Sequence, residues 1–401
     1  MLNMSLLSLN DDVLLVIFAH IHGQDALNVS LTSKRAYTLA GCRIPSQITC
    51  SSPQQLQRLH AYLLSSLPDG NLRAAVVEQF IISASTFEDP PDEEGDTYYA
   101  SNFSQARLIG DILLEVRRLR DLSVERYQPC FVHDIRIGDA LRYLSSLINL
   151  RLFTVGDTSL TLLQSSRSDR LSRLTLSYYI SEEFPLKDEK KSLPPLLSVF
   201  SLFHHLHTVK LWNFDPDIGL TRDETLSGLS FPSIRYLRLS ETSVPALDIV
   251  ELCPNLSTLV VSLDWAAELI TSEGPKWPPL QRLMVMQFSD VLPFYERLST
   301  VNQVQISGSL LLNPDSQSTA DDPLHRFLAF LRNASPVGLY MCMRGCSETD
   351  GQKAFWNDVP RIAPRLRSLE LQLHPSLTES DIDDYSWLVS TTLPTSSRTH
   401  S

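Results

Sequence analysis

Cysteines, histidines and carboxylates occur in this sequence, but not at the spacings that a metal or catalytic site requires. Cys342 and Cys346 are the only close pair among the six cysteines, and no second pair lies at a spacing that would complete a zinc tetrahedron. The histidines at 204, 205 and 207 fall where a predicted helix runs into a strand, so their side chains should diverge. Adjacent carboxylates such as Glu182 and Glu183 point to different faces. We therefore predict no metal site, no cofactor, and reduced thiols that pack as small apolar groups.

The sequence also lacks the motifs of the common enzyme classes. It contains no GxxxxGK[ST] phosphate loop, no GxGxxG after a strand, no HExxH zinc helix and no GxSxG elbow. Catalytic triads can assemble from distant positions, so an enzyme with a dispersed active site stays an alternative. The missing motifs nevertheless predict a protein that is not an enzyme.

Composition is that of a globular protein and argues against two classes of partner. The 401 residues, 43% hydrophobic and 20% charged, suffice for two or three domains. A formal charge of −12 argues against a general nucleic-acid binder, whose affinity needs a net basic face. The longest apolar run, Val13 to Ala19, is too short to span a bilayer. We expect a soluble intracellular protein, cytoplasmic or nuclear, with no nucleic-acid or membrane partner.

The first forty residues of the sequence are predicted to be helical. Asn10 suits the N-cap of a first helix, the two aspartates after it suit the positive helix end, and Gly23 ends the helix. The apolar residues on one arc of this helix are Val13, Leu14, Ile17, Phe18 and Ile21. Further apolar residues at 15, 16 and 19 lie outside that arc, so either the remainder of the chain or another protein must cover the helix.

Two shorter helices follow, the second of the three opened by Asp25 and the third by Ser33. The whole segment resembles an F-box, the motif that docks substrate receptors onto the Skp-type adaptor of cullin-RING ubiquitin ligases. The matching positions are Leu9, Asp12-Val13-Leu14, Ile17-Phe18, Asp25, Leu27 and Thr32-Ser33-Lys34-Arg35. The sequence departs from the family at Asn10, where the family has proline, and at Ala36, where it has an aromatic residue.

This resemblance implies a small three-helix domain at residues 5–45 that binds a Skp-type adaptor and, through it, a cullin. The side chains that we expect to bury apolar area against the adaptor are Leu9, Val13, Leu14, Ile17, Phe18, Leu27 and Leu31. An ordinary core helix of a larger domain is the alternative interpretation of residues 13–21.

Beyond a predicted helical linker at residues 46–70, segments of the form L-x-x-L-x-L recur in the style of leucine-rich repeats. They begin at residues 77, 119, 147, 171, 206, 234, 256, 280, 301, 334 and 366. After a first spacing of 42 the copies follow at 21 to 35 residues, with helix-like runs between most of them. A Pro just before several of the predicted strands ends the preceding helix.

These repeats predict an α/β fold in which the F-box is followed, over residues 71–390, by a leucine-rich-repeat-like βα solenoid with a curved parallel sheet. Longer spacings are predicted to hold loops at residues 88–96, 187–191 and 313–323, and residues 391–401 are a predicted disordered tail. The overall order, F-box then linker then divergent repeats, resembles that of fungal F-box proteins.

If the last two apolar side chains of each motif point into the core, the side chains between them and next to them point out of the sheet. From one repeat to the next, these outward side chains line up in columns. Basic, aromatic and Met side chains of the middle repeats fall in these columns: Arg151, Phe153, Arg173, Lys210, Trp212, Tyr236, Arg238, Arg282 and Met286. Such residues are enriched at interface hot spots. We expect them to recognise an acidic or phosphorylated substrate segment, with Trp212 as an apolar anchor; scattered surface charge is the alternative.

The function predicted from the sequence is a non-catalytic substrate-receptor subunit of a Skp–cullin–F-box ubiquitin ligase, with an unknown protein as substrate. The alternative is a leucine-rich-repeat interaction scaffold unrelated to ubiquitin, in which the N-terminal helices cap the solenoid. The two differ in whether residues 1–45 pack on the repeats or form a separate domain.

Overall fold

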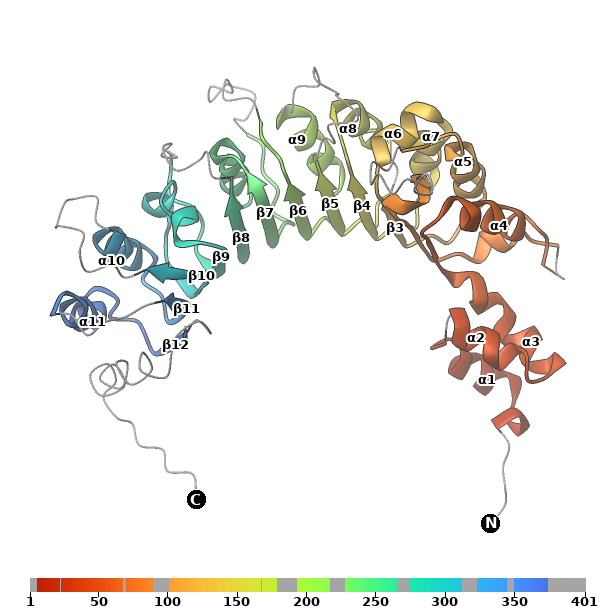
Figure 1. Ribbon diagram of the computed structural model, residues 1–401, viewed down its shortest axis with the longest axis horizontal. Coiled ribbons are helices and arrows are strands. Elements are labelled where there is room, and N and C mark those ends of the chain that lie inside the picture. Colours follow the sequence, from red (N-terminus) through yellow and green to blue (C-terminus); the bar gives the residue numbers. More distant parts are fainter. Residues whose placement is uncertain are drawn as a thin grey trace, which may run out of the picture. The chain divides into compact units, whose positions relative to one another are not determined.

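The computed structural model describes residues 6–373, except 22, 68–69, 89–100, 167, 179–192, 217–227, 265–273, 312–322 and 345–349. The chain divides into two compact units, Met1–Leu206 and His207–Ser401 (Figure 1). Cys346, most of the three predicted loops and the predicted tail at 391–401 lie outside the described residues. No helix in the described part of the chain is long and apolar enough to cross a membrane.

The first unit begins with short helices. They are η1 (Leu6–Ser8), α1 (Asp11–Phe18), α2 (Gly23–Ser30), α3 (Lys34–Ala40) and η2 (Gly41–Ser46). Two of the three predicted caps are present, since the side chain of Asn10 accepts a hydrogen bond from the Asp12 N–H and that of Ser33 accepts one from the Ala36 N–H. These caps set the starts of α1 and α3 where the sequence predicts them. Two other predictions are wrong, because Asp25 lies inside α2 and Gly23 begins α2, whereas α1 already ends at Phe18.

Strands and helices then alternate through the remainder of the first unit. The strands are β1 (Gln47–Cys50), β2 (Gln79–Ile82), β3 (Asp121–Val124), β4 (Asn149–Phe153) and β5 (Arg173–Ser177). Between them lie α4 (Pro53–Leu63), η3 (Arg73–Val76), η4 (Ala84–Phe87), α5 (Ala106–Glu115), α6 (Tyr127–His133), α7 (Arg136–Tyr143) and α8 (Asp157–Leu163), and α9 (Leu193–Leu202) follows β5. The strands pair in chain order and all in parallel, and Figure 1 shows the helices on one side of them.

The segment predicted as a helical linker is part of this sheet, which corrects the predicted boundary at residue 70. The helix is present as α4, and Ser52 and Pro53 open it as predicted. However, β1 precedes it and pairs with β2, with Ile48 opposite Phe80 and Cys50 opposite Ile82. The L-x-x-L-x-L pattern is not matched here, because Pro45 occupies its first position and Cys50 its last.

The second unit continues the alternation with more irregular connections. Its strands are β6 (Thr208–Trp212), β7 (Tyr236–Thr242), β8 (Thr258–Leu263), β9 (Leu280–Val285), β10 (Val301–Leu311), β11 (Gly338–Arg344) and β12 (Ser368–Leu373). The helices are η5 (Val244–Leu252), η7 (Phe288–Val291), η8 (Tyr295–Arg297), α10 (Pro323–Ala334) and α11 (Asp350–Ile362). These strands too pair in chain order and in parallel.

The register of the strands follows the repeated motif. In most repeats the motif begins two residues before the strand, and its last two apolar side chains are buried, as for Phe80 and Ile82 or Leu237 and Leu239. The repeat predicted to begin at Ala334 is displaced by two residues. Ala334 ends α10, and the strand pairs Gly338 with Gln303 and Tyr340 with Gln305.

One main-chain hydrogen-bond pattern recurs at the entry to the strands and holds the repeats in step. The carbonyl of Arg120 accepts from two N–H groups of the next repeat, Ile148 and Asn149, at 2.8 and 2.9 Å. The carbonyl of Arg235 does the same for Ser257 and Thr258, at 2.9 Å each. The recurrence supports a βα solenoid, in which each repeat is held by its neighbours.

A polar network ties the helices of the first unit together. His60 of α4 contacts Asp111 of α5 at 3.0 Å, and Arg136 of α7 donates to Asp111 at 2.6 Å and to Asp134 at 2.7 Å. Partial burial opposes the charged form of Asp111, but the hydrogen bonds from His60 and Arg136 outweigh it and lower the pKa of this carboxyl. The network therefore stabilises the ionised carboxylate of Asp111.

Candidate binding surfaces

The three N-terminal helices have a hydrophobic core of their own. Leu14, Phe18 and Ala40 are fully buried, and half-buried side chains pack around them: Leu7, Leu9, Ile17, Ile21, Val29 and Leu39. Every member of this cluster belongs to residues 7–40. Residues 6–40 thus form a separate small core, although η2 leads from it directly into β1.

This core changes the role of two residues predicted to contact an adaptor. Leu14 has 0% and Phe18 1% of its surface exposed, so neither presents apolar area to a partner in this arrangement. Leu9, Ile17 and Leu27 are half-buried. The periodicity of α1 identifies apolar positions correctly, but it does not say which arc faces inward.

The apolar side chains that remain exposed lie elsewhere on the same helices. Val13 and Leu31, both predicted to bind an adaptor, are 47% and 75% exposed. Val16, which was not among the predicted residues, is 65% exposed and lies about 200° around α1 from Leu14. Leu15 and Leu6 are also about half exposed. The sequence carried a signal for Val16 and Leu15, since both lie outside the predicted apolar arc.

Arg35, part of the Lys-Arg pair of the motif, holds the start of α1 in place. Its guanidinium donates to Asp11 Oδ1 at 2.8 and 2.5 Å and to the carbonyls of Leu7 and Leu9 at 2.5 and 2.8 Å. A guanidinium can make this many bonds at once because its five N–H groups point outward in a planar fork. Arg35 therefore fixes the N-terminal turn against α3.

In the second unit, two cations lie side by side on the face of the sheet opposite the buried side chains. Lys210 of β6 pairs in register with Arg238 of β7. Arg238 lies over the ring of Trp212, 4.6 Å from its centroid, and donates to Ser240 Oγ at 2.9 Å. Lys210 makes no ion pair with any described residue. Two unneutralised cations beside an indole can contact an acidic side chain and an apolar one together.

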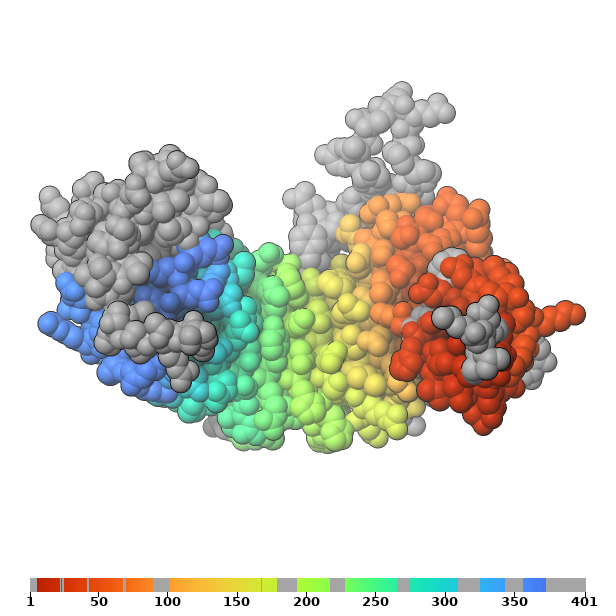
Figure 2. Space-filling view, turned by 90° about the horizontal axis from the view of Figure 1, so that it is seen from below, coloured from red at the N-terminus to blue at the C-terminus, as the bar shows by residue number. Residues whose placement is uncertain are grey.

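Lys210 and Arg238 begin a row that runs in register across the whole second unit and that we call the central row. Its members, one from each of β6 to β12, are Lys210, Arg238, Val260, Met284, Gln305, Tyr340 and Glu370. The space-filling view in Figure 2 shows successive repeats of this unit, from green to blue, following one another in chain order. The central row has cations at one end and a carboxylate at the other.

The remaining predicted substrate residues divide between the units. Tyr236 and Arg282 of the second unit belong to the row beside the central row, and Met286, 47% exposed, follows β9. Arg151, Phe153 and Arg173 lie on β4 and β5 of the first unit, where Arg151 pairs in register with Thr175. The expectation of one patch that includes both groups stays a prediction.

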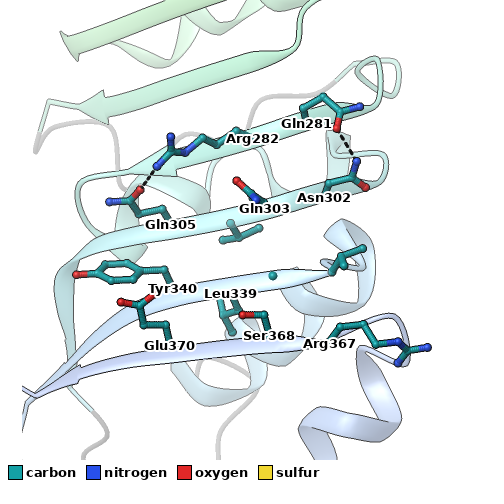
Figure 3. A pocket seen from close by; sticks show the side chains of 13 residues that line it. Gln281, Arg282, Asn302, Gln303, Gln305, Leu339, Tyr340, Arg367, Ser368 and Glu370 are labelled. Carbon is teal, nitrogen blue, oxygen red and sulfur yellow. Dashed lines mark hydrogen bonds between the residues drawn. The ribbon is translucent and has the colours of Figure 1, made fainter. Parts of the chain in front are cut away.

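A hollow of about 910 Å³ lies on the face of β9 to β12 and was not predicted from the sequence (Figure 3). Its walls are mostly polar: Gln281, Arg282, Asn302, Gln303, Gln305, Tyr340, Arg367, Ser368 and Glu370. At its centre, Gly338 leaves β11 without a side chain between Gln303 and Ser368, its partners on β10 and β12. A glycine inside a strand was the available signal, because it often marks the close approach of another backbone.

Two hydrogen bonds fix the amides on one side of the hollow and leave one amide free. Asn302 donates to Gln281 at 2.6 Å and Arg282 donates to Gln305 at 2.7 Å (Figure 3). The side chain of Gln303 lies between these pairs and makes no hydrogen bond with the described residues. Its amide can both donate and accept, as a peptide group requires.

Comparison with protein families identifies the first of these surfaces. Residues 6–41 match the F-box domain family. The match includes α1, α2 and α3, and it agrees with the resemblance drawn from the sequence. A search of curated proteins found no match to the chain. The F-box match thus assigns a family to the three helices and leaves the function of the repeats to be argued from their geometry.

Neither a metal centre nor an activated thiol is evident in the described residues. No group of three or more His, Cys, Asp and Glu side chains in that part of the chain could hold a metal ion. Cys50, Cys130, Cys253 and Cys342 are free and buried. Burial raises the pKa of the Cys253 thiol to about 12 and that of Cys130 well above its ordinary value, which keeps both thiols protonated and unreactive.

Proposed function

We propose that this chain is a non-catalytic substrate-receptor subunit of a Skp–cullin–F-box ubiquitin ligase. The F-box match at residues 6–41 is the observation that carries the proposal. In this role the three helices dock on a Skp-type adaptor and, through it, on a cullin. The repeats, which we assign to the leucine-rich type, hold a protein substrate near the ubiquitin-loaded enzyme. The chain then contributes proximity and no bond chemistry of its own.

The exposed apolar side chains of the helices support the docking role. Val13 and Leu31 keep the role predicted from the sequence, and we add Val16 and Leu15 because they are also exposed on α1. Half-buried Leu9, Ile17 and Leu27 can add contact area at the edges, whereas Leu14 and Phe18 support the surface from beneath. Burying exposed aliphatic surface stabilises an interface by roughly 25 cal/mol per Å² before the costs of association.

The substrate role is supported by half-buried and exposed side chains on the face of the sheet opposite its core. Lys210, Arg238 and Trp212 offer charge-assisted hydrogen bonds and an apolar ring to an acidic or phosphorylated segment. Tyr236, Arg282 and Met286 extend this surface within the second unit. Arg151, Phe153 and Arg173 offer a similar combination on the first unit.

The docking role is tested by capture of a purified Skp-type adaptor on full-length protein. We expect the unchanged chain to capture it and Val16→Glu to lose at least tenfold in affinity, because a charge would enter an apolar interface. The matched control is Val132→Glu on α6, where a valine of nearly equal exposure, 68% against 65%, lies outside the F-box. Equal capture by both variants would contradict the docking surface. No capture by the unchanged chain would leave the repeats as a scaffold unrelated to ubiquitin.

A further inference from the structure

The central row is ordered by charge. Lys210 and Arg238 begin it, buried Val260, half-buried Met284 and Gln305 follow, and Tyr340 and Glu370 end it. Glu370 is its sole carboxylate, is exposed, and makes no ion pair with any described residue. From Arg238 to Glu370 the row crosses five strand spacings, which is about 24 Å. An extended peptide covers that length with about seven residues.

The end of the row that carries Glu370 can receive a cation. Figure 3 shows Tyr340 and Glu370 side by side on adjacent strands at the edge of the hollow. A Lys or Arg side chain placed there would contact the ring of Tyr340 and the carboxylate of Glu370 together. Arg282 does not compete for this position, since its guanidinium is bonded to Gln305, and Arg367 bonds the carbonyls of Pro364 and Leu366.

Gly338 gives a main chain room to lie against the sheet beside this position. An added Cβ would meet the Gln303 side chain at 3.8 Å and the Asn302 carbonyl at 4.0 Å, which are ordinary contacts. Glycine is thus not required by packing here, unlike at Gly308, where an added Cβ would lie 2.4 Å from the Met286 carbonyl. Glycine inside a strand destabilises the strand, because it has no side chain to pack and loses more conformational freedom on folding than other residues. A ligand backbone over Gly338, bonded to the Gln303 amide, accounts for this cost.

We propose that the central row binds an extended protein segment lying across β6 to β12, and that it selects the order of charges in that segment. In the bound segment an acidic residue contacts Lys210 and Arg238, an apolar residue contacts Met284, and a basic residue contacts Tyr340 and Glu370, about seven positions from the acidic one. The main chain passes over the hollow beside Gly338. This inference rests on the proposed receptor function and specifies its substrate class.

A nucleic acid fits the same surface less well. A strand of phosphates would be attracted to Lys210 and Arg238, but it would carry negative charge to Glu370 at the other end. A polyanion is therefore attracted to one end of the row and repelled by the other. A peptide whose charges change sign along its length is attracted to both ends.

The test uses full-length protein and synthetic fluorescent peptides, with affinity read from fluorescence anisotropy. The probe has two Glu, a central Leu and a Lys seven residues beyond the second Glu, joined by Gly and Ser, and is made in both chain directions. A second peptide replaces the Lys with Ala, and a twelve-nucleotide oligouridine is the third probe. We expect the Lys peptide to bind about fivefold more tightly than the Ala peptide in at least one chain direction.

Variants assign this preference to residues. Glu370→Lys should abolish the difference between the Lys and Ala peptides, whereas Glu296→Lys, the same charge change at an exposed position on η8, should preserve it. Gly338→Phe fills the hollow and should lower the affinity for both peptides at least tenfold. The melting temperature of the protein should not change. Equal affinity for the two peptides, no binding of either, or tighter binding of oligouridine would overturn the proposal.

Adaptor capture by the same preparations separates the two conclusions. If the protein captures the adaptor but does not distinguish the two peptides, the proposed role of the central row is refuted and the receptor function is not affected. Selective peptide binding without adaptor capture would refute the ubiquitin role and support the row as the binding surface of a different kind of protein.

Discussion

The F-box helices and the open face of the second unit differ in what they leave exposed. The helices expose aliphatic side chains such as Val16 and Leu31 around a small core of Leu14 and Phe18. The sheet buries most of its aliphatic residues, exposes Gln303 and Glu370, and leaves Lys210 and Arg238 half-buried along the central row.

This contrast separates two kinds of recognition. Burial of an aliphatic patch supplies affinity with little demand on the sequence of the partner, which suits a contact made with one constant adaptor. A row of charged and amide groups supplies specificity and speed of association, which suits a contact that must distinguish among substrates. The two regions should therefore respond differently to mutation, to salt and to pH.

The largest effect should come from placing a charge in the core of the F-box rather than on its surface. Leu14→Glu buries a carboxylate without a partner, which costs several kcal/mol and should unfold the three helices. Val16→Glu should change the free energy of unfolding by no more than about 0.5 kcal/mol. Hydrogen exchange over residues 6–41 measures both. Native protection in Leu14→Glu would show that the core of the F-box lies elsewhere.

A smaller but sizeable effect is expected from reversing the cations of the sheet. The double variant Lys210→Glu with Arg238→Glu should bind the Lys peptide at least tenfold more weakly. Its association rate should no longer depend on salt, because the electrostatic attraction between the two cations and the Glu residues of the peptide is lost. Adding Arg151→Glu tests whether the first unit contributes. Adaptor capture by the same variants should be unchanged. Unaltered peptide binding would reduce the two cations to ordinary surface charge.

Removal of the Arg35 side chain should loosen the F-box without unfolding it. Arg35→Ala breaks the bonds to Asp11 and to the carbonyls of Leu7 and Leu9. Because the guanidinium is partly exposed, we expect a loss of about 1 kcal/mol in the free energy of unfolding, measured by urea denaturation. Arg35→Lys should recover part of this loss, since one ammonium cannot reach all three acceptors. Equal stability of the three proteins would contradict the assigned role.

The smallest effect concerns the helices behind the sheet of the first unit and depends on pH. The pKa of Asp111 is lowered in the folded state, so its contribution to stability is complete above its unfolded pKa of about 4 and is lost as pH falls through the folded value. The melting temperature of Asp111→Asn should therefore be a few degrees below that of the unchanged protein at pH 7. Near pH 2 the two melting temperatures should be equal. A constant difference across this range would exclude an electrostatic cause.

Much of the fold could be predicted because its elements repeat. The L-x-x-L-x-L pattern placed ten strands in order, and the inward positions of Phe80, Leu237 and their equivalents follow from the two-residue period of a strand. The pattern failed at β1, where Pro45 and Cys50 stand at the first and last motif positions, and at Ala334, which α10 includes in its last turn. At both places a local helix or turn competes with a weak strand signal, and a single sequence does not decide between them.

The sequence by itself determined which residues are apolar, where the first and third helices of the F-box begin and which side chains share one face of a strand, because caps and periodicity act within a few residues. Only the tertiary structure decided which arc of α1 faces inward, since that depends on the packing of α2 and α3 against it. It also decided that Tyr340, and not Gly338, stands beside Gln305, and that Gly338 opens a hollow next to Glu370. Register between strands far apart in the chain is set by long-range pairing, and the local sequence does not contain it.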